Sequence, residues 1–334
     1  MTVTEIGEHA LIERIRLRSG RARDWVVLGI GDDAAVVAPD RGGLDVLTTN
    51  SLVEDVHFRR DWTSPHAIGH KALAVNLSDL AAMGARPRAA LLNLALPASY
   101  PVADFDELID GFVALADRAQ APLVGGNLTR SPGPLVITVT ALGAAHGRKL
   151  LTRRGGRPDD ELYVTGPLGG AAAGLALLES GSTRATLDAA RADGIARYER
   201  PEPRLACGSA VARSRSATAC IDLSDGLADA ARQIAAASKT GVELDAAGIP
   251  VHSAATAWAH EAGRHAWEIA MAGGEDYELL FAVAPRRRRG FLATASRFKD
   301  VAMTRVGRLT AESGAWVRDG EDRQPLGPGF SHFM

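Results

Sequence analysis

The side chains best suited to chemistry in this sequence are aspartates that stand beside glycines or small hydroxyl residues. Five aspartates and three hydroxyls make up this set: Asp32, Asp33, Asp79, Asp222 and Asp225, with Thr49, Ser51 and Ser224. Oxygen ligands without histidine or cysteine clusters favour Mg²⁺ over zinc or copper. Mg²⁺ usually takes one or two carboxylates and completes its shell with water and phosphate oxygens. Several Mg²⁺ ions around a triphosphate would therefore need about as many acids as this set contains. Any one aspartate, taken alone, could equally cap a helix or a turn.

The segment 71–84, KALAVNLSDLAAMG, predicts a helix that positions part of this chemistry. Leucines recur on one face and oxygen-bearing side chains share another: Leu73, Leu77 and Leu80 against Asn76 and Asp79. Gly84 can adopt positive φ where the helix stops. A carboxylate on so apolar a helix is either buried against a partner or holds a ligand.

Length and composition indicate two globular domains. A chain of 334 residues is too long for one ordinary core, and its hydrophobic fraction of 46% and charged fraction of 23% are typical of soluble proteins. The net charge of −2 argues against a nucleic-acid or membrane-surface partner, and the arginine run 286–289 is interpreted as a solvated helix start. With no apolar run of membrane-spanning length and no N-terminal segment resembling a signal peptide, we expect a cytoplasmic protein. Cys207 and Cys220 lack metal-ligand spacing and fit a reducing compartment.

Residues 1–147 predict a mixed α/β domain. The segment 26–37, VVLGIGDDAAVV, indicates two strands joined by a glycine turn that presents acids. A strand over 44–49 is expected to stop at Thr48-Thr49-Asn50-Ser51, and a short apolar piece at 122–124 to stop at Gly125-Gly126-Asn127. Further strands are predicted over 89–96 and 135–142, and helices over 5–15 and 105–119. Every polar cluster of this half is therefore expected at a strand end or on the central helix.

Residues 148–334 predict a second domain, since 144–160 has the composition of a loop. A strand over 161–165, a glycine-rich turn and a helix over 171–178 could hold an anion, although the spacing matches neither a P-loop nor a dinucleotide fingerprint. A strand over 217–221 leads into DLSDG, which opens a helix over 226–237. The loop GGED, which contains Glu275, leads into a strand over 277–283.

Several motifs, taken in order, resemble the thiamine-monophosphate kinase family. They are GIGDDAAV, TTNSLVEDVHF, KALAVNLSDLAAMGARP, VGGNLTRS, LTRRGGRPDD, IDLSDGL, GGEDYELLF and GFSHF. This family belongs with aminoimidazole ribonucleotide synthetase, the hydrogenase-maturation protein HypE and selenophosphate synthetase. The resemblance implies a two-domain PurM-like fold, with an α/β N-terminal domain that dimerises through its sheet and an α+β C-terminal domain. It also implies that ATP binds between the domains without a P-loop.

The resemblance further implies phosphoryl transfer from ATP to thiamine monophosphate, giving thiamine diphosphate, with Mg²⁺ as the metal. The implied metal ligands are Asp33, Thr49, Asn50, Asp79, Asn127, Asp222 and Asp225. The implied nucleotide contacts are Gly126, Asn127, Arg153 and Ser224, and the implied substrate contacts are His57, Glu275 and Phe330. We therefore expect a small-molecule substrate and a homodimer, and neither nucleic acid nor membrane as a partner. His57 could instead be a structural histidine, and Phe330 could only pack the tail.

Three positions depart from the family pattern. Asn50 and Asn127 stand where the family has aspartate, and Ser331 replaces the usual aspartate before His332. An amide still offers a carbonyl oxygen, but it lacks the charge that offsets dehydration of the ion, so reduced activity is predicted. Two alternatives remain open: a relative that phosphorylates or activates a different small molecule with ATP, and a non-catalytic paralogue that binds nucleotide or thiamine phosphate.

Overall fold

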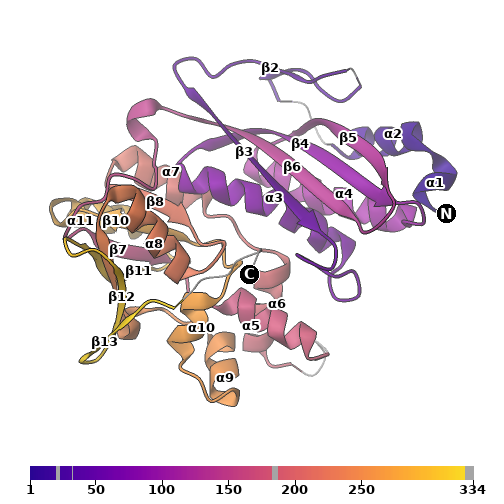
Figure 1. Cartoon of the computed structure of the whole chain (residues 1–334). Coiled ribbons are helices and arrows are strands. Elements are labelled where there is room, and N and C mark those ends of the chain that lie inside the picture. The colour runs from indigo at the N-terminus through magenta and orange to yellow at the C-terminus, as the bar shows by residue number, and fades with distance from the viewer. Residues whose placement is uncertain (20–22, 32, 183–186, 328–334) are drawn as a thin grey trace. The chain divides into compact units, whose positions relative to one another are not determined.

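The computed structural model describes residues 1–19, 23–31, 33–182 and 187–327, which form two compact units (Figure 1). Unit 1 comprises Met1–Leu80 and Ala85–Gly147, and unit 2 comprises Ala81–Gly84 and Arg148–Met334. The end of the central helix and its following turn thus group with unit 2. Gly84 adopts a φ of 64° at this turn, as the sequence predicts. Asp32 and Phe330 lie outside the described residues.

Unit 1 is a sheet with helices on one face. Its helices are α1 (Val3–Ile6), α2 (Glu8–Arg18), α3 (Pro65–Ala82) and α4 (Val102–Ala119). Its strands are β1 (Val26–Leu28), β2 (Val36–Val37), β3 (Leu44–Val53), β4 (Arg86–Pro97), β5 (Leu123–Ser131) and β6 (Val136–Ala145). In the described residues, four strands form a sheet in the order β3-β6-β4-β5, in which only β4 and β5 run parallel. The strands β1 and β2 pair separately as an antiparallel ribbon.

The two faces of the unit 1 sheet differ in burial. Along β4, Leu92, Leu94 and Leu96 are buried, whereas Leu91 and Asn93 are exposed. Because side chains alternate along a strand, these two sets lie on opposite faces. The helices α3 and α4, with their buried leucines and phenylalanines, pack on the first face (Figure 1). The second face, called the open face below, is covered by no helix or strand in the described part of unit 1.

Unit 2 is a larger sheet with helices on both faces. Its helices are α5 (Gly170–Glu179), α6 (Ala189–Glu199), α7 (Leu205–Ser214), α8 (Leu227–Ser238), α9 (Ser253–Glu261), α10 (Ala266–Ala272) and α11 (Arg288–Ala295). Its strands are β7 (Glu161–Thr165), β8 (Ala219–Asp222), β9 (Gly241–Asp245), β10 (Leu279–Val283), β11 (Met303–Thr310), β12 (Ala315–Asp319) and β13 (Asp322–Pro325). The sheet order within the described residues is β13-β12-β9-β11-β7-β10-β8.

The strand β10 shows how unit 2 buries both faces of its sheet. Leu280 and Ala282 belong to the core cluster that contains Ile234 of α8. Phe281 lies in a separate cluster with Phe291 of α11, and the two rings are 5.6 Å apart. Since all five residues of β10 are buried, the strand is apolar throughout, as expected for a strand covered on both sides. Each large side chain buried here contributes about 1.5–3 kcal/mol.

The sequence located most of these elements but misjudged where two strands end. The strand β3 continues to Val53 and β5 continues to Ser131, so Asn50 and Asn127 lie inside strands instead of after them. The reason is pairing: every residue of β3 has a partner on β6, and Asn127 pairs with Asn93 of β4. The sequence also gave no signal for α6, α10 and β11 to β13. No helix within the described ranges combines the length and apolarity needed to cross a membrane.

Candidate functional site

The carboxylate of Asp79 is the centre of a polar cluster between α3 and β3 in unit 1. Thr48 Oγ1 donates to Asp79 Oδ2 at 2.5 Å, and Asn50 Nδ2 donates to the same oxygen at 2.8 Å. Asn50 Nδ2 also lies 3.2 Å from Asn76 Oδ1, and Asn76, which is fully buried, donates to Ala72 O. Both side-chain hydrogen bonds to Asp79 thus end on Oδ2, and Oδ1 accepts none from the described residues. A half-buried carboxylate held this way can offer its second oxygen to a ligand.

The sheet separates this cluster from Thr49 and Asn127, two other candidate ligands of unit 1. Thr49 follows Thr48 and points to the open face, where its hydroxyl donates to Val139 O and accepts from Thr140 Oγ1. Asn127 also lies on the open face, with its Nδ2 3.1 Å from Asn93 Oδ1. Asn50 and Asp79 therefore lie together, whereas Thr49 and Asn127 lie on the opposite side of the sheet.

A polar row crosses the open face at this level. Ser51 Oγ and Thr138 Oγ1 are 2.7 Å apart, Thr138 pairs in register with Asn93, and Asn93 contacts Asn127. Such cross-strand polar pairs stabilise a sheet whether or not a ligand is bound. The sequence singled out Ser51 and Asn127 but missed Asn93 and Thr138. Asn93 is the single polar residue of the apolar run 89–96, and Thr138 belongs to the alternating segment 135–142, so both could have been noticed.

The remaining candidates of unit 1 occupy turns and a strand. Asp33 is exposed in the connection between β1 and β2. Gly126 lies within β5 opposite Leu92, where a Cβ atom would fall 1.8 Å from Leu92 O. His57 is half-buried, its Nδ1 accepts from Val53 N at 3.1 Å, and its carbonyl oxygen accepts from the buried Lys71 Nζ at 3.1 Å. The backbone thus requires glycine at 126, and one ring nitrogen of His57 serves the turn.

In unit 2, the motifs IDLSDG and GGED come together at one edge of the sheet. Asp222 is the last residue of β8 and is buried, while Ser224 Oγ donates to Asp225 Oδ2 at 2.9 Å. Glu275 N donates to Ser224 O at 2.7 Å, and Tyr277 N donates to Leu223 O at 3.0 Å. Two motifs some 50 residues apart therefore share one loop structure, with Glu275 at a φ of 67°.

Arg153 lies over helix α8 of unit 2. Its Nη1 is 2.5 Å from Gln233 Oε1, and its carbonyl oxygen accepts from Ser238 Oγ at 3.3 Å. The guanidinium is exposed and makes no ion pair with a described carboxylate. It is therefore available to phosphate oxygens, as the resemblance implies.

The glycine turn before α5 holds a carboxylate of the protein itself. Asp276 accepts from Gly169 N at 2.6 Å and from Ala171 N at 3.2 Å. The sequence suggested an anion site here, and the side chain of Asp276 occupies these donors. Burial raises the pKa of the Asp276 carboxyl to about 7, against the lowering effect of the two backbone N–H donors.

Glu278 anchors a buried ion pair beside this turn. Both guanidinium nitrogens Nε and Nη2 of Arg204 contact its carboxylate, and Thr165 Oγ1 donates to Oε2 at 2.5 Å. Arg197 Nη1 lies 3.5 Å from the same carboxylate. Glu278 is fully buried, so these contacts replace the water that its charge has lost. The sequence placed no function on Arg204 or Glu278.

The donor chemistry of both units suits a hard cation. Asp79 and Asn50 in unit 1 and Asp222 and Asp225 in unit 2 offer carboxylate and amide oxygens, which Mg²⁺ prefers. Across 1–19, 23–31, 33–182 and 187–327, however, no three histidine, cysteine or acidic side chains converge to hold a metal ion. Mg²⁺ often takes one or two protein carboxylates and completes its shell with waters and phosphate oxygens.

Comparison with known proteins identifies the family. The descriptions "AIR synthase related protein, N-terminal domain" and "AIR synthase related protein, C-terminal domain" match residues 31–145 and 157–319. The thiamine-monophosphate kinase of Escherichia coli strain K12 is 40% identical over 331 residues, covering 98% of both chains. The chain belongs to the thiamine-monophosphate kinase family. The resemblance carried by the sequence motifs is thereby confirmed.

Solved structures support the same assignment to the thiamine-monophosphate kinase family. The crystal structure of the Stenotrophomonas maltophilia K279a thiamine-monophosphate kinase has 39% identity and a TM-score of 0.83, covering 93% of this chain and 96% of its own. A structure described as AaThiL complexed with AMPPCP and TMP has 31% identity and a TM-score of 0.78, covering 100% of this chain and 99% of its own. The expected two-domain PurM-like fold is confirmed by these matches.

Proposed function

We propose that the protein is a Mg²⁺-dependent kinase that transfers the γ-phosphoryl group of ATP to thiamine monophosphate, giving thiamine diphosphate and ADP. The observation that carries this proposal is the likeness over the whole chain to a relative complexed with AMPPCP and TMP. The identity of 40% to a named thiamine-monophosphate kinase supports the same reaction. The sequence contains no P-loop motif, so the protein would bind ATP without one.

In this proposal the chain's own residues align the reactants and Mg²⁺ supplies charge neutralisation when bound. The candidate Mg²⁺ ligands are Asp79 and Asn50 in unit 1, and Asp222 and Asp225 in unit 2. Arg153 would pair with phosphate oxygens. Phosphoryl transfer asks chiefly for alignment and electrostatic stabilisation, so a dedicated protein nucleophile is unnecessary.

The substrate side of the proposal rests on His57 and Glu275. His57 is fixed by Val53 N on one ring nitrogen, and Glu275 is fixed through its backbone to Ser224 O. Both side chains are half-buried, and the backbone of His57 is also held, since its N–H donates to Val53 O at 2.9 Å. The role predicted for Phe330 lies outside the described residues.

We also propose that the protein acts as a homodimer through the open face of unit 1. On this face Leu47 is 70% exposed and Leu91 is 41% exposed, although both belong to paired strands. Leu142 pairs in register with Leu47 and is diagonal to Leu91 on the same face, and a contiguous exposed apolar patch commonly marks an interface. Replacing Leu47 by Asp should convert a dimer to a monomer in sedimentation velocity, and a monomeric wild type at micromolar concentration would refute the proposal.

A single-turnover assay tests the kinase reaction. Wild-type protein is mixed with γ-labelled ATP, thiamine monophosphate and Mg²⁺, and labelled thiamine diphosphate is measured. Appearance of labelled product is expected. ADP formation with another acceptor but none with thiamine monophosphate would replace the substrate assignment, and tight nucleotide binding without any product would identify a non-catalytic protein.

The double variant Asn50→Asp with Asn127→Asp refines this test, since it restores the two carboxylates of the family pattern. Turnover should rise at limiting Mg²⁺ if the acceptor is thiamine monophosphate, because the added charges favour metal binding. Unchanged turnover with normal binding of ATP and Mg²⁺ would point to a different acceptor. The cytoplasmic location expected from the sequence stays a prediction.

A further inference from the structure

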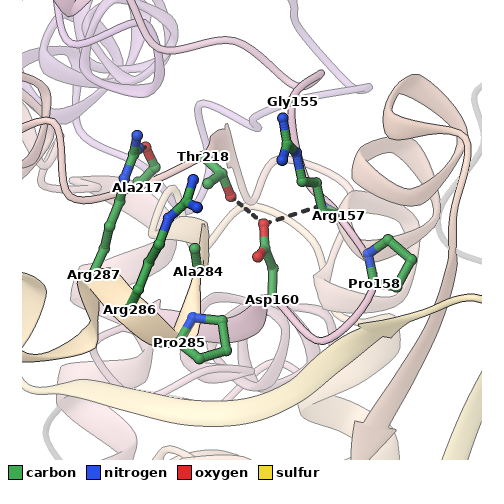
Figure 2. A pocket seen from close by; sticks show the side chains of 10 residues that line it. All are labelled: Gly155, Arg157, Pro158, Asp160, Ala217, Thr218, Ala284, Pro285, Arg286 and Arg287. Atoms are coloured by element: carbon green, nitrogen blue, oxygen red, sulfur yellow. Dashed lines mark hydrogen bonds between the residues drawn. The ribbon is translucent and has the colours of Figure 1, made fainter.

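Unit 2 contains a pocket lined by arginines at the end of the sheet where β8 begins and β10 ends (Figure 2). We call it the arginine pocket and define it by Arg157, Arg286 and Arg287, with Asp160 and Thr218 between them. Its volume is about 460 Å³. Figure 2 shows the three arginine side chains extending toward the same side of the pocket, around Thr218.

The arginine pocket carries positive charge that the described residues do not neutralise. Arg157 and Arg286 have no acidic partner among the described side chains, whereas the neighbouring Arg288 lies 3.4 Å from Glu161. Arg287 Nη1 donates to Ala217 O at 3.2 Å, which fixes this guanidinium at the pocket wall. The run 286–289 is thus more than a solvated helix start, because its first two members line a concavity.

The single carboxylate in the pocket is already engaged. Asp160 is 2% exposed, and its Oδ2 accepts from Thr218 Oγ1 at 2.6 Å and from Arg157 N at 3.0 Å. Three guanidiniums and one carboxylate leave a net charge of about two positive units around the cavity. Arg157 is anchored there by its backbone, so its side chain remains available to a ligand.

We propose that the arginine pocket binds a small phosphorylated molecule. Planar guanidiniums match phosphate oxygens in bidentate pairs, and a phosphate monoester carries a charge close to the surplus in the pocket. Pro158, Ala284 and Pro285 add apolar wall to the lining, which suits an organic group attached to the phosphate. The volume lies within the range of small-molecule sites and exceeds what a lone phosphate needs.

This site is separate from the acids assigned to the kinase reaction. Thr218 lies just before β8, whereas Asp222 ends that strand. Four residues of strand place the two about 13 Å apart along the sheet. The antiparallel strand β10 shows the same separation. Leu279, its first residue, pairs with Asp222, whereas the pocket residue Ala284 follows its last residue. The inference therefore does not depend on the proposed function.

Calorimetric titration with phenyl phosphate in EDTA tests the proposal, because chelation removes the Mg²⁺ on which the proposed kinase site depends. Wild-type protein should bind the probe, and the double variant Arg157→Ala with Arg286→Ala should bind at least about tenfold more weakly. The backbone donor of Arg157 to Asp160 is retained in this variant. The control is Arg289→Ala with Arg297→Ala, which removes the same charge from exposed arginines outside the pocket and should bind normally.

Three results would overturn the proposal. They are absence of binding to wild-type protein at millimolar phenyl phosphate, an equal loss of affinity in the control variant, and equally effective binding of citrate. The last result would show a general anion site without preference for phosphate. Melting temperatures within about 2 °C of wild type for both double variants would exclude unfolding as the cause.

Discussion

The side-chain amide of Asn50 donates to the carboxylate of Asp79, with 2.8 Å between Nδ2 and Oδ2. An ionised aspartate at position 50 could not make this bond, since it only accepts. Two carboxylates at such a distance repel each other unless a cation lies between them. The amide therefore orders Asp79 without a metal, and the proposed Mg²⁺ ligands carry one negative charge fewer than they would with aspartate at position 50.

Replacing Asn50 by Asp should make the stability of the protein depend on Mg²⁺. In EDTA the new carboxylate loses the hydrogen bond and faces Asp79, which should cost roughly 1–3 kcal/mol of the free energy of unfolding. Millimolar Mg²⁺ should recover much of that loss. Thermal unfolding in EDTA and in Mg²⁺ measures the loss of stability and its recovery by the metal. Gln324→Glu is the control, because it adds the same charge at an exposed position of β13 that belongs to none of the candidate metal ligands, and it should respond little to the metal. Identical shifts in both buffers for Asn50→Asp would contradict the metal assignment.

Replacing Asp79 by Ala should weaken Mg²⁺-dependent ATP binding by at least about tenfold, since it removes the one carboxylate of the cluster. Calorimetric titration of ATP with and without Mg²⁺ gives the comparison. Asp61→Ala is the control, because Asp61 is exposed and pairs with Arg59 at 3.2 Å on the surface. Equal ATP affinity in Mg²⁺ and in EDTA for wild-type protein would contradict the proposal that Mg²⁺ at Asp79 contributes to ATP binding.

Replacing Gly126 by Ala should destabilise unit 1, whatever its effect on nucleotide binding. The added Cβ would lie 1.8 Å from Leu92 O, so the pairing of β4 and β5 would have to open. We expect a loss of at least about 2–3 kcal/mol, measured by urea unfolding. Gly133→Ala, which meets no atom within 4 Å, should be nearly neutral. If Gly126→Ala kept full stability and lost only ATP affinity, the glycine would be a nucleotide contact alone.

Replacing Arg204 by Ala should destabilise unit 2 by about 3–5 kcal/mol, because it leaves the buried charge of Glu278 with fewer donors. The control is Arg264→Ala, which breaks an exposed pair with Glu268 at 3.3 Å and should change stability by less than about 1 kcal/mol. Chemical unfolding of the two variants provides the test. If both variants lost less than about 1 kcal/mol, the attraction between Arg204 and Glu278 would not exceed the cost of removing the two charges from water.

The sequence predicted the parts of the site whose signals are local. Leucines at helical spacing located α3, and the β-branched and apolar runs located most strands of unit 1. The pairing of Asn50 with Asp79 was not predictable, because it depends on which residue of β3 faces α3. Once β3 is seen to continue to Val53, alternation along the strand explains it: Thr48 and Asn50 face the helix and Thr49 faces away.

Burial decided the outcome where local signals were ambiguous. The sequence predicted the motif GGED as a loop before a strand, but it did not predict that Asp276 turns inward and caps the start of α5. Arg204 carried no signal because its partner Glu278 lies 74 residues away in the chain. Such long-range pairing of charges is fixed by the packing of the sheet, which a periodic pattern does not encode.

The pH dependence of stability should reveal the state of Asp276. Burial raises the pKa of its carboxyl from 3.8 to about 7, so the folded protein binds this proton more tightly than the unfolded chain does. Unfolding then releases the proton between about pH 4 and pH 7. The contribution of Asp276 to the free energy of unfolding is therefore full below pH 4, falls as pH rises through this window, and is level above pH 7.

Urea unfolding of wild-type protein and Asp276→Asn at several pH values from 4 to 8 isolates this contribution, because the other titrating groups are common to both proteins. Between pH 4 and pH 8, wild-type protein should lose up to on the order of 4 kcal/mol relative to the variant. A constant difference across this range would mean that the carboxyl is ionised throughout. In that case the N–H groups of Gly169 and Ala171, and not burial, would set its pKa.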